Sequence, residues 1–204
     1  MTRTLRRRPV LAYDDAAKGK RPGVVVVHEW WGHNQHARNQ AVRLAKAGYV
    51  GFALDMYGKG KEATHPDDAQ KFMKQATRDP KVVSARFNAA VDTLKNQPQV
   101  DPDRIAAIGY CFGGAVVLDM TRAGADLDAV ATFHGDLSAY GNPARKGVVK
   151  PRILVQTGGA DEMVPKKQVE EFRKEMTSAG AQFEVVTYPK AKHSFTNPTR
   201  QSSR

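Results

Sequence analysis

The chain has 204 residues with an ordinary globular composition, 41% hydrophobic and 26% charged, so we expect a single domain spanning residues 1–204. No segment approaches the roughly 18 consecutive apolar residues of a membrane helix, and no apolar stretch follows the basic first residues as it would in a secretory signal. The single cysteine excludes an intramolecular disulfide and a cysteine-rich metal site. We therefore expect a cytoplasmic protein that uses neither a metal nor an organic cofactor.

The net charge of +11 raises the question of an anionic partner. Part of the excess is local to the two ends, at Arg3, Arg6, Arg7, Arg8, Arg200 and Arg204. The other basic residues are spread along helix-like stretches, where a solvated face explains them, and no zinc-finger or RNP-type motif accompanies them. We expect neither nucleic acid nor a membrane as partner.

Apolar runs alternate with amphipathic segments, the pattern of βαβ units in a mainly parallel sheet covered by helices on both faces. In the first half of the chain the sequence predicts a short strand near 10–13, a strand at 24–27, a helix at 36–47, a strand at 49–54, a loop at 55–66 and helices at 66–76 and 81–96. In the second half it predicts a turn at 101–103, a strand at 105–109, a helix at 113–123, strands at 129–134 and 153–157, a helix at 164–179 and a strand at 183–188. No helical pattern follows residue 193, so the final helix usual in such folds is expected to be absent or supplied otherwise.

The central motif is Gly109-Tyr110-Cys111-Phe112-Gly113, between a predicted strand and a predicted helix. This is a nucleophile-elbow pattern with cysteine as the central residue. The turn is too tight for side chains two residues on either side, which explains the glycines. Such an elbow lifts the sulfur to the carboxyl end of the sheet, where the helix N-terminus favours a thiolate and backbone N–H groups stabilise an oxyanion. Cys111 is the candidate nucleophile, although a lone cysteine is more often an inert buried residue.

A nucleophile needs a base and a group that orients the base. Enzymes with this elbow place nucleophile, acid and histidine in that chain order. Asp161 follows the strand at 153–157 and His193 follows the strand at 183–188, so both lie at carboxyl ends of strands, where open α/β sheets bind ligands. The alternatives are a helix N-cap for Asp161 and a surface loop residue for His193.

The segment His28-Glu29-Trp30-Trp31-Gly32 ends the first long strand, where enzymes with this elbow place their second oxyanion donor. A backbone N–H near Trp30 is the candidate. Glu29 is either a surface loop residue or a carboxylate that faces Cys111, in which case its charge keeps the thiol protonated until substrate displaces it. Trp30 and Trp31 either wall an apolar pocket or pack in the core. His134, which ends the strand at 129–134, precedes Asp161 and so has the wrong order for the base, but it is a candidate lining residue.

With these residues assembled, the sequence resembles the dienelactone hydrolase family of α/β-hydrolases. The matching segments run in the family's order from about residue 11 to residue 198: HEWWG (28–32), DMYGKG (55–60), GYCFGG (109–114), GGADEMVP (158–165) and HSFTNP (193–198). The resemblance implies a triad of Cys111, His193 and Asp161, with Glu29 as the resting partner of the thiol. It also implies oxyanion donors in the backbone of Trp30 and Phe112.

The resemblance also bears on the substrate. Family members of the chlorocatechol pathway hold the substrate carboxylate with two arginines, one in the loop that matches Tyr57-Gly58-Lys59 and one four residues past the histidine. Here Lys59 and Asn197 occupy those places, and they do not reproduce a bidentate arginine pair. We expect a small carboxyl ester or lactone rather than dienelactone itself, bordered by Tyr57, Phe195 and these two residues.

Three other functions are weighed against ester hydrolysis. A non-hydrolytic or redox-sensing binding protein would use Cys111 on the same scaffold, but the intact order of cysteine, aspartate and histidine argues against it. Cleavage of peptides or thioesters by the same triad is separable only by substrate profiling. A DNA-binding role has only the net charge in its favour. A homodimer is expected if a missing terminal helix leaves apolar surface uncovered.

Overall fold

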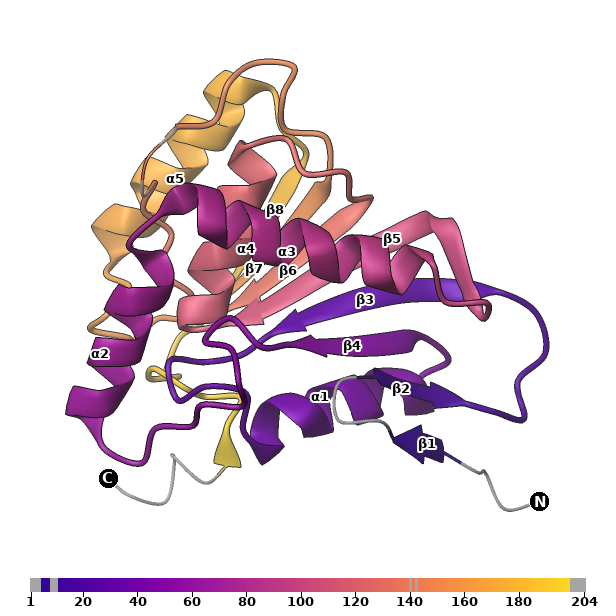
Figure 1. The fold of residues 1–204 in the computed structure, drawn as a ribbon. Coiled ribbons are helices and arrows are strands. Elements are labelled where there is room, and N and C mark those ends of the chain that lie inside the picture. The colour runs from indigo at the N-terminus through magenta and orange to yellow at the C-terminus, as the bar shows by residue number, and fades with distance from the viewer. Residues whose placement is uncertain (1–4, 8–10, 140, 142, 199–204) are drawn as a thin grey trace. The chain divides into compact units, whose positions relative to one another are not determined.

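A computed structural model describes residues 5–7, 11–139, 141 and 143–198 (Figure 1). The chain divides into two compact units, Met1–Ala107 and Ile108–Arg204. Among the helices in the described part of the chain, none combines the length and apolar character needed to cross a membrane. The described residues also contain no cluster of three or more His, Cys, Asp or Glu side chains arranged to hold a metal ion.

The first unit contains four strands in the order β1-β2-β4-β3: β1 (Leu5–Arg7), β2 (Leu11–Asp14), β3 (Arg21–Val27) and β4 (Val50–Leu54). The pairs β1/β2 and β2/β4 are antiparallel, whereas β3 and β4 are parallel. The four consecutive valines of β3 are all buried, as expected for a strand covered on both faces.

Helices cover both faces of β3 and β4. The helices of this unit are α1 (Gln35–Lys46), α2 (Pro66–Thr77) and α3 (Pro80–Lys95). Gly51 lies against the backbone of Ala41 in α1, and Gly23 lies against Leu94 in α3. Gly51 pairs with Val24, the neighbour of Gly23 along β3, and neighbouring residues of a strand point to opposite faces. The two helices therefore pack on opposite sides of this sheet.

Strand β5 (Val100–Tyr110) begins in the first unit and ends in the second. The predicted turn at 101–103 is wrong, because these residues belong to the strand. Asp101 Oδ1 does accept a hydrogen bond from the N–H of Asp103 at 3.3 Å, the local contact that an Asp-Pro-Asp sequence favours. That contact forms without ending the strand.

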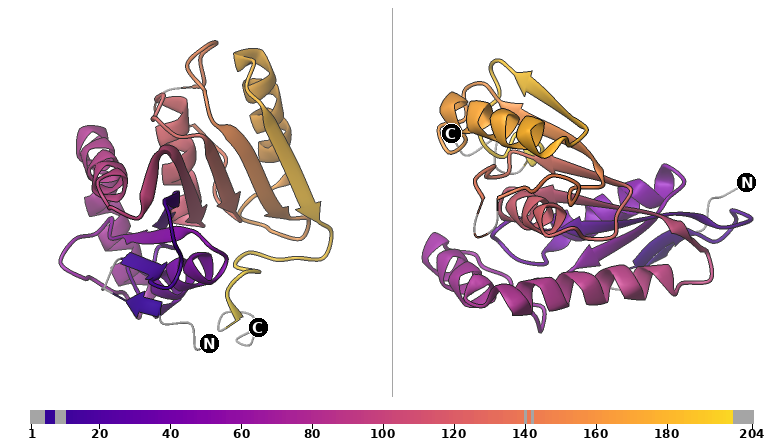
Figure 2. Two further views of the ribbon diagram at one scale, coloured as in Figure 1. Left: turned by 90° about the vertical axis from the view of Figure 1, so that its right-hand side faces the viewer. Right: turned by 90° about the horizontal axis from the view of Figure 1, so that it is seen from above.

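The second unit contains α4 (Phe112–Arg122), β6 (Ala129–Phe133), β7 (Arg152–Gly158), α5 (Lys166–Ala179) and β8 (Phe183–Tyr188). Strands β6, β7 and β8 lie side by side and are parallel (Figure 2). Helices α4 and α5 contact each other through an ion pair, in which the guanidinium of Arg122 in α4 lies 2.8 Å from the carboxylate of Glu175 in α5. The side chain of Arg122 is only 1% exposed.

The structure confirms the predicted α/β fold with mainly parallel strands, and each predicted helix and long strand is found within a few residues of its expected bounds. The short strand expected near 10–13 corresponds to β2, although residue 10 lies outside the described residues. Strand β1 was not predicted. Residues 189–197 contain no helix, whereas Pro198, the last described residue, is helical. Residues 199–204 lie outside the described residues, so the expected absence of a final helix stays a prediction.

Candidate active site

Cys111 lies on a strained turn between β5 and α4. Its backbone φ is 51° and ψ is −117°, an unusual conformation for a residue other than glycine. A side chain at Gly109 would place a Cβ 2.1 Å from the carbonyl oxygen of Gly113, so only glycine fits there. The N–H of Cys111 donates to the carbonyl of Phe133 at 3.0 Å, which ties the turn to the end of β6.

Asp161 and His193 are brought together by the loops that follow two paired strands. Gly158 at the end of β7 pairs with Tyr188 at the end of β8. Beyond that pair, the N–H of Gly159 donates to the carbonyl of Tyr188 at 2.8 Å, and the N–H of Ala160 donates to the carbonyl of Ala191 at 3.0 Å. These backbone hydrogen bonds hold the two loops together and leave His193 beside Asp161.

The three candidate triad side chains form a continuous line of contacts. His193 Nδ1 lies 2.9 Å from Asp161 Oδ2, and His193 Nε2 lies 3.2 Å from Cys111 Sγ. The side chain of Asp161 is fully buried and that of His193 is 10% exposed. All three residues belong to the second unit, so this arrangement is internal to it. The sulfur of Cys111 therefore lies beside the imidazole of His193.

Asp161 lies in the loop before α5 but is not its N-cap. The N-cap alternative is wrong, because α5 begins at Lys166 and its N-cap is Pro165. Its Oδ1 accepts hydrogen bonds from the N–H groups of Met163 at 2.9 Å and Val164 at 3.3 Å, which fix the loop before α5, while Oδ2 contacts His193. Burial acts to raise the pKa of Asp161, but the hydrogen bond to His193 and the two backbone donors outweigh it and lower the pKa below its ordinary value. Asp161 is therefore a carboxylate at neutral pH.

The charge around His193 favours the imidazolium form. Burial alone would lower the pKa of the ring, but the hydrogen bonds to Asp161 and Cys111 outweigh burial and raise the pKa to about 10. The resulting arrangement, a protonated imidazole between a carboxylate and a sulfur, is suited to stabilise a thiolate and to deliver a proton to a leaving group.

In the first unit, the segment after β3 is fixed by contacts from the loop after β4. His28 Nε2 accepts a hydrogen bond from the N–H of Met56 at 3.1 Å, and its Nδ1 contacts the carbonyl of Glu29. The hydroxyl of Tyr57 donates to the carbonyl of Trp30 at 2.8 Å. These contacts orient the two peptide groups on either side of Trp30. Sequence reasoning did not assign this function to His28.

The other residues expected to bind substrate in the first unit differ in exposure. Tyr57 is buried, whereas Lys59 is exposed and has a positive φ of 57°. Trp31 is 7% exposed and packs in a small core with Ala63 and Ala69, which favours the core interpretation of this residue. Glu29 is 3% exposed, so it is not the surface loop residue that one interpretation allowed.

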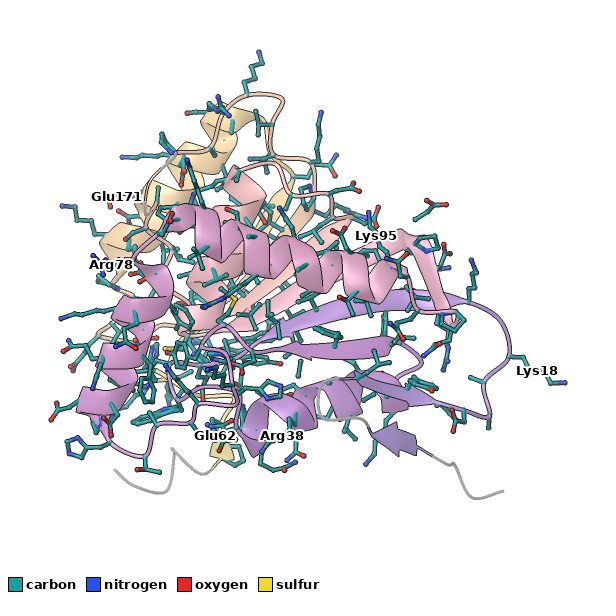
Figure 3. The ribbon with its side chains drawn as sticks, in the orientation of Figure 1. Lys18, Arg38, Glu62, Arg78, Lys95 and Glu171 are labelled. Carbon is teal, nitrogen blue, oxygen red and sulfur yellow. The ribbon has the colours of Figure 1, made fainter. Side chains whose placement is uncertain are left out.

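The loop shape at Lys59 comes from Asp55. Its Oδ1 accepts hydrogen bonds from the N–H groups of Tyr57 and Gly58 at 2.9 and 2.8 Å, and its Oδ2 accepts one from Gly60 at 2.9 Å. Three backbone donors on one carboxylate make this loop an ordered turn rather than a flexible connection. Farther along, Arg38 and Glu62 point toward each other in an ion pair of 3.0 Å (Figure 3).

The residues around His193 in the second unit are more enclosed than the sequence indicated. His134 is 0% exposed, so its ring has no access to solvent, and Asn197 is 2% exposed. Phe195 is partly buried, with its ring 5.3 Å from that of His134 and 5.4 Å from that of Tyr188. The ring of His134 packs against the loop that carries His193.

The sequence profile of the dienelactone hydrolase family matches residues 8–204. The chain belongs to the dienelactone hydrolase family. Family membership makes it a hydrolase acting on ester bonds.

Relatives within this family match nearly the whole chain. "Protein usf" from Aquifex pyrophilus is 32% identical over 197 residues, covering 94% of this chain and 84% of that protein. An Aquifex aeolicus protein with the provisional name carboxymethylenebutenolidase is 29% identical over 94% of this chain and 84% of its own length. The structure named m3DLH has a TM-score of 0.87 at 38% identity, covering 95% of this chain and 80% of that one. The dienelactone hydrolase-like promiscuous phosphotriesterase P91, from metagenomic libraries, has a TM-score of 0.86 at 34% identity, covering 94% and 80%.

Proposed function

We propose that this protein hydrolyses small carboxyl esters or lactones through a covalent thioester on Cys111. The observation that carries the proposal is the line of contacts from Cys111 through His193 to Asp161, with distances of 3.2 and 2.9 Å. The strained elbow at Cys111 supports it, because strain of this kind concentrates at functional sites. The family's name and those of its members support ester or lactone chemistry.

The reaction begins from a thiolate beside a protonated His193. The sulfur attacks the substrate carbonyl carbon, and the carbonyl π electrons move to its oxygen to form an oxyanion. As the tetrahedral intermediate collapses, His193 donates its Nε2 proton to the leaving alkoxide, which departs as the alcohol and leaves a thioester on Cys111. Neutral His193 then takes a proton from water, whose oxygen attacks the thioester. Collapse releases the carboxylic acid and regenerates the thiolate–imidazolium pair, while Asp161 orients the ring throughout.

We further propose the N–H groups of Phe112 and Trp30 as the oxyanion donors. Phe112 directly follows Cys111 as the first residue of α4, and the N–H of the residue after the nucleophile is an oxyanion donor in elbows of this kind. Trp30 follows a peptide whose carbonyl is held by His28, which gives its N–H a fixed direction. For Glu29 we propose the role that the family resemblance implies, a resting partner that substrate displaces from the thiol.

The proposed substrates are small and need not carry a carboxylate. Neither Lys59, which is exposed, nor Asn197, which is buried, carries the planar guanidinium with which arginine holds a carboxylate through two hydrogen bonds. A small acyl ester or a simple lactone places no such demand on the site. Cytoplasmic location and dimerisation remain predictions.

The test is hydrolysis of p-nitrophenyl acetate and of a panel of esters with increasing acyl length. We expect the wild type to turn over the short esters best and Cys111→Ala to lose this activity. Cys111→Ser should retain little, because a serine hydroxyl is a far weaker nucleophile next to an imidazolium that already holds its proton. Unchanged turnover by Cys111→Ala would contradict the proposal, and so would a wild type that hydrolyses no ester or lactone of the panel.

A further inference from the structure

His134 stands in an unusual place at the end of β6. It has a positive φ of 43°, which is uncommon for a residue with a side chain, and it is completely buried. Its N–H donates to the carbonyl of Gln156 in β7 at 2.9 Å, so its backbone is fixed to the neighbouring strand. The mechanism above uses no property of this residue, and its chain order excludes it as the base.

The ring of His134 contacts three of the four side chains between His193 and Thr196 in the loop that carries His193. Its Nε2 lies 2.8 Å from the hydroxyl oxygen of Thr196. Its ring meets that of His193 edge to face, with centroids 5.0 Å apart and planes at 69°, and it meets that of Phe195 in the same manner at 5.3 Å and 79°. The loop thus rests on one buried side chain that directly follows β6.

The residue before His134 holds the nucleophile. The carbonyl of Phe133 accepts the hydrogen bond from the N–H of Cys111 at 3.0 Å. Two consecutive residues at the end of β6 therefore fix both partners of the sulfur–imidazole contact, Phe133 through the backbone of Cys111 and His134 through the loop of His193. Because both supports come from one strand end, a shift of the His193 loop on His134 changes the distance between Cys111 Sγ and His193 Nε2 directly.

We propose that His134 is a positioning residue that holds His193 at hydrogen-bond distance from Cys111, acting through its ring contact with His193 and its hydrogen bond to Thr196. The inference rests on the proposed function, since it gives His134 a role in forming the reactive thiolate–imidazolium pair. In this role His134 acts through His193 and Thr196 and takes no part in the bond changes. The bond to Thr196 fixes the loop along its length, and the edge-to-face contact fixes the tilt of the catalytic ring.

The test separates positioning from simple structural support by measuring the thiolate itself. Cys111 is the single cysteine of the chain, so the rate of alkylation by iodoacetamide reports on this sulfur alone. The rate is followed across pH 5–9, with the ultraviolet absorbance of the thiolate measured alongside. Thr196→Val removes the hydroxyl with little change in shape, Thr196→Ser retains it, and His134→Phe keeps a ring but loses the nitrogen. Thr187→Val, at an exposed position of β8, is the matched control.

Loss of one hydrogen bond of about 1.4 kcal/mol corresponds to a tenfold change. We expect Thr196→Val and His134→Phe to alkylate about tenfold more slowly near neutral pH, with their pH profiles shifted toward higher pH. Thr196→Ser should recover to within about twofold of the wild type, and Thr187→Val should match it. The proposal would be overturned if Thr196→Val were alkylated at the same rate and with the same pH profile as the wild type. This holds whatever the melting temperature of Thr196→Val, and even if His134→Phe failed to fold.

The same variants distinguish this inference from the proposed function. If the alkylation profiles shift as expected while the wild type hydrolyses no ester, positioning holds and ester hydrolysis is wrong. If the wild type hydrolyses esters and Thr196→Val matches it both in kcat/KM and in alkylation, the proposed function holds and the role of His134 is wrong.

Discussion

Replacing Asp161 by asparagine tests how the carboxylate acts on His193. Oδ1 of Asp161 accepts from two backbone N–H groups, those of Met163 and Val164, whereas Oδ2 faces His193 Nδ1. An asparagine amide has one oxygen, and the two N–H donors require an acceptor. Its oxygen must therefore stay with the backbone, which turns its NH₂ group toward His193.

That orientation reverses the tautomer of the imidazole. An NH₂ group can only donate, so His193 Nδ1 must accept and the proton moves to Nε2 in the neutral ring. Neutral His193 can then no longer take a proton from water at Nε2, and the charge that stabilised the imidazolium is gone. A wrong tautomer at an equivalent position in a serine-histidine-aspartate triad costs on the order of 10⁴-fold in kcat. We expect Asp161→Asn to lose about 10³–10⁴-fold in kcat/KM, which corresponds to about 4–5.5 kcal/mol.

The measurement compares Asp161→Asn with Asp161→Ala, using p-nitrophenyl acetate hydrolysis and urea unfolding. The asparagine variant keeps the backbone contacts and should unfold close to the wild type. The alanine variant loses them as well and should be less stable by about 1–2 kcal/mol, because each such hydrogen bond contributes about 0.5–1.5 kcal/mol net. An asparagine variant within tenfold of wild-type kcat/KM would refute the reasoning, because it would mean that the amide presents its oxygen to His193.

Three further predictions concern stability. Burial lowers the pKa of His28 to about 4, so the unfolded chain takes up a proton first and stability falls as pH decreases from about 6.5 toward 4. In urea unfolding of the wild type, the free energy of unfolding should fall by about 2 kcal/mol between pH 7 and 5 because of this group, and His28→Asn should lack that decrease. Glu175→Gln leaves the buried Arg122 guanidinium without its main counter-charge and should destabilise the folded protein by about 3 kcal/mol in the same assay. An unchanged unfolding midpoint would contradict this, because it would show that Asp119 and the nearby carbonyls are enough to stabilise the guanidinium. Gly109→Ala places a Cβ 2.1 Å from a carbonyl oxygen and should lower the melting temperature and the activity together, whereas Gly141→Ala, with open space around it, should change neither.

The sequence predicted the parts of the site that local pattern determines. The strand, glycine, cysteine and helix around Cys111 give the elbow, because its tight turn imposes a residue choice at each position. Asp161 and His193 follow strands that pair in parallel, so the ends of those strands had to meet. Strand and loop positions therefore carried enough information to bring these side chains to one place.

The sequence could not predict contacts that depend on how separate loops pack. The packing of His134 beneath His193 depends on a positive φ and on a hydroxyl 62 residues away, neither of which leaves a periodic signal. His28 is similar, since its tautomer is determined by a backbone donor 28 residues later. The Asp-Pro-Asp segment gave a wrong turn at 101–103 because local propensity there yields to pairing in the sheet.

The central claim is that Cys111 becomes acylated during turnover. Because p-nitrophenyl acetate has a good leaving group, acylation should precede a slower deacylation, and a rapid acid quench should trap the intermediate. We predict a burst of p-nitrophenol approaching one equivalent per chain, with mass spectrometry locating one acetyl group on the peptide that contains Cys111. An acetyl group on a serine or threonine hydroxyl, with Cys111 unmodified during the burst, would contradict the account.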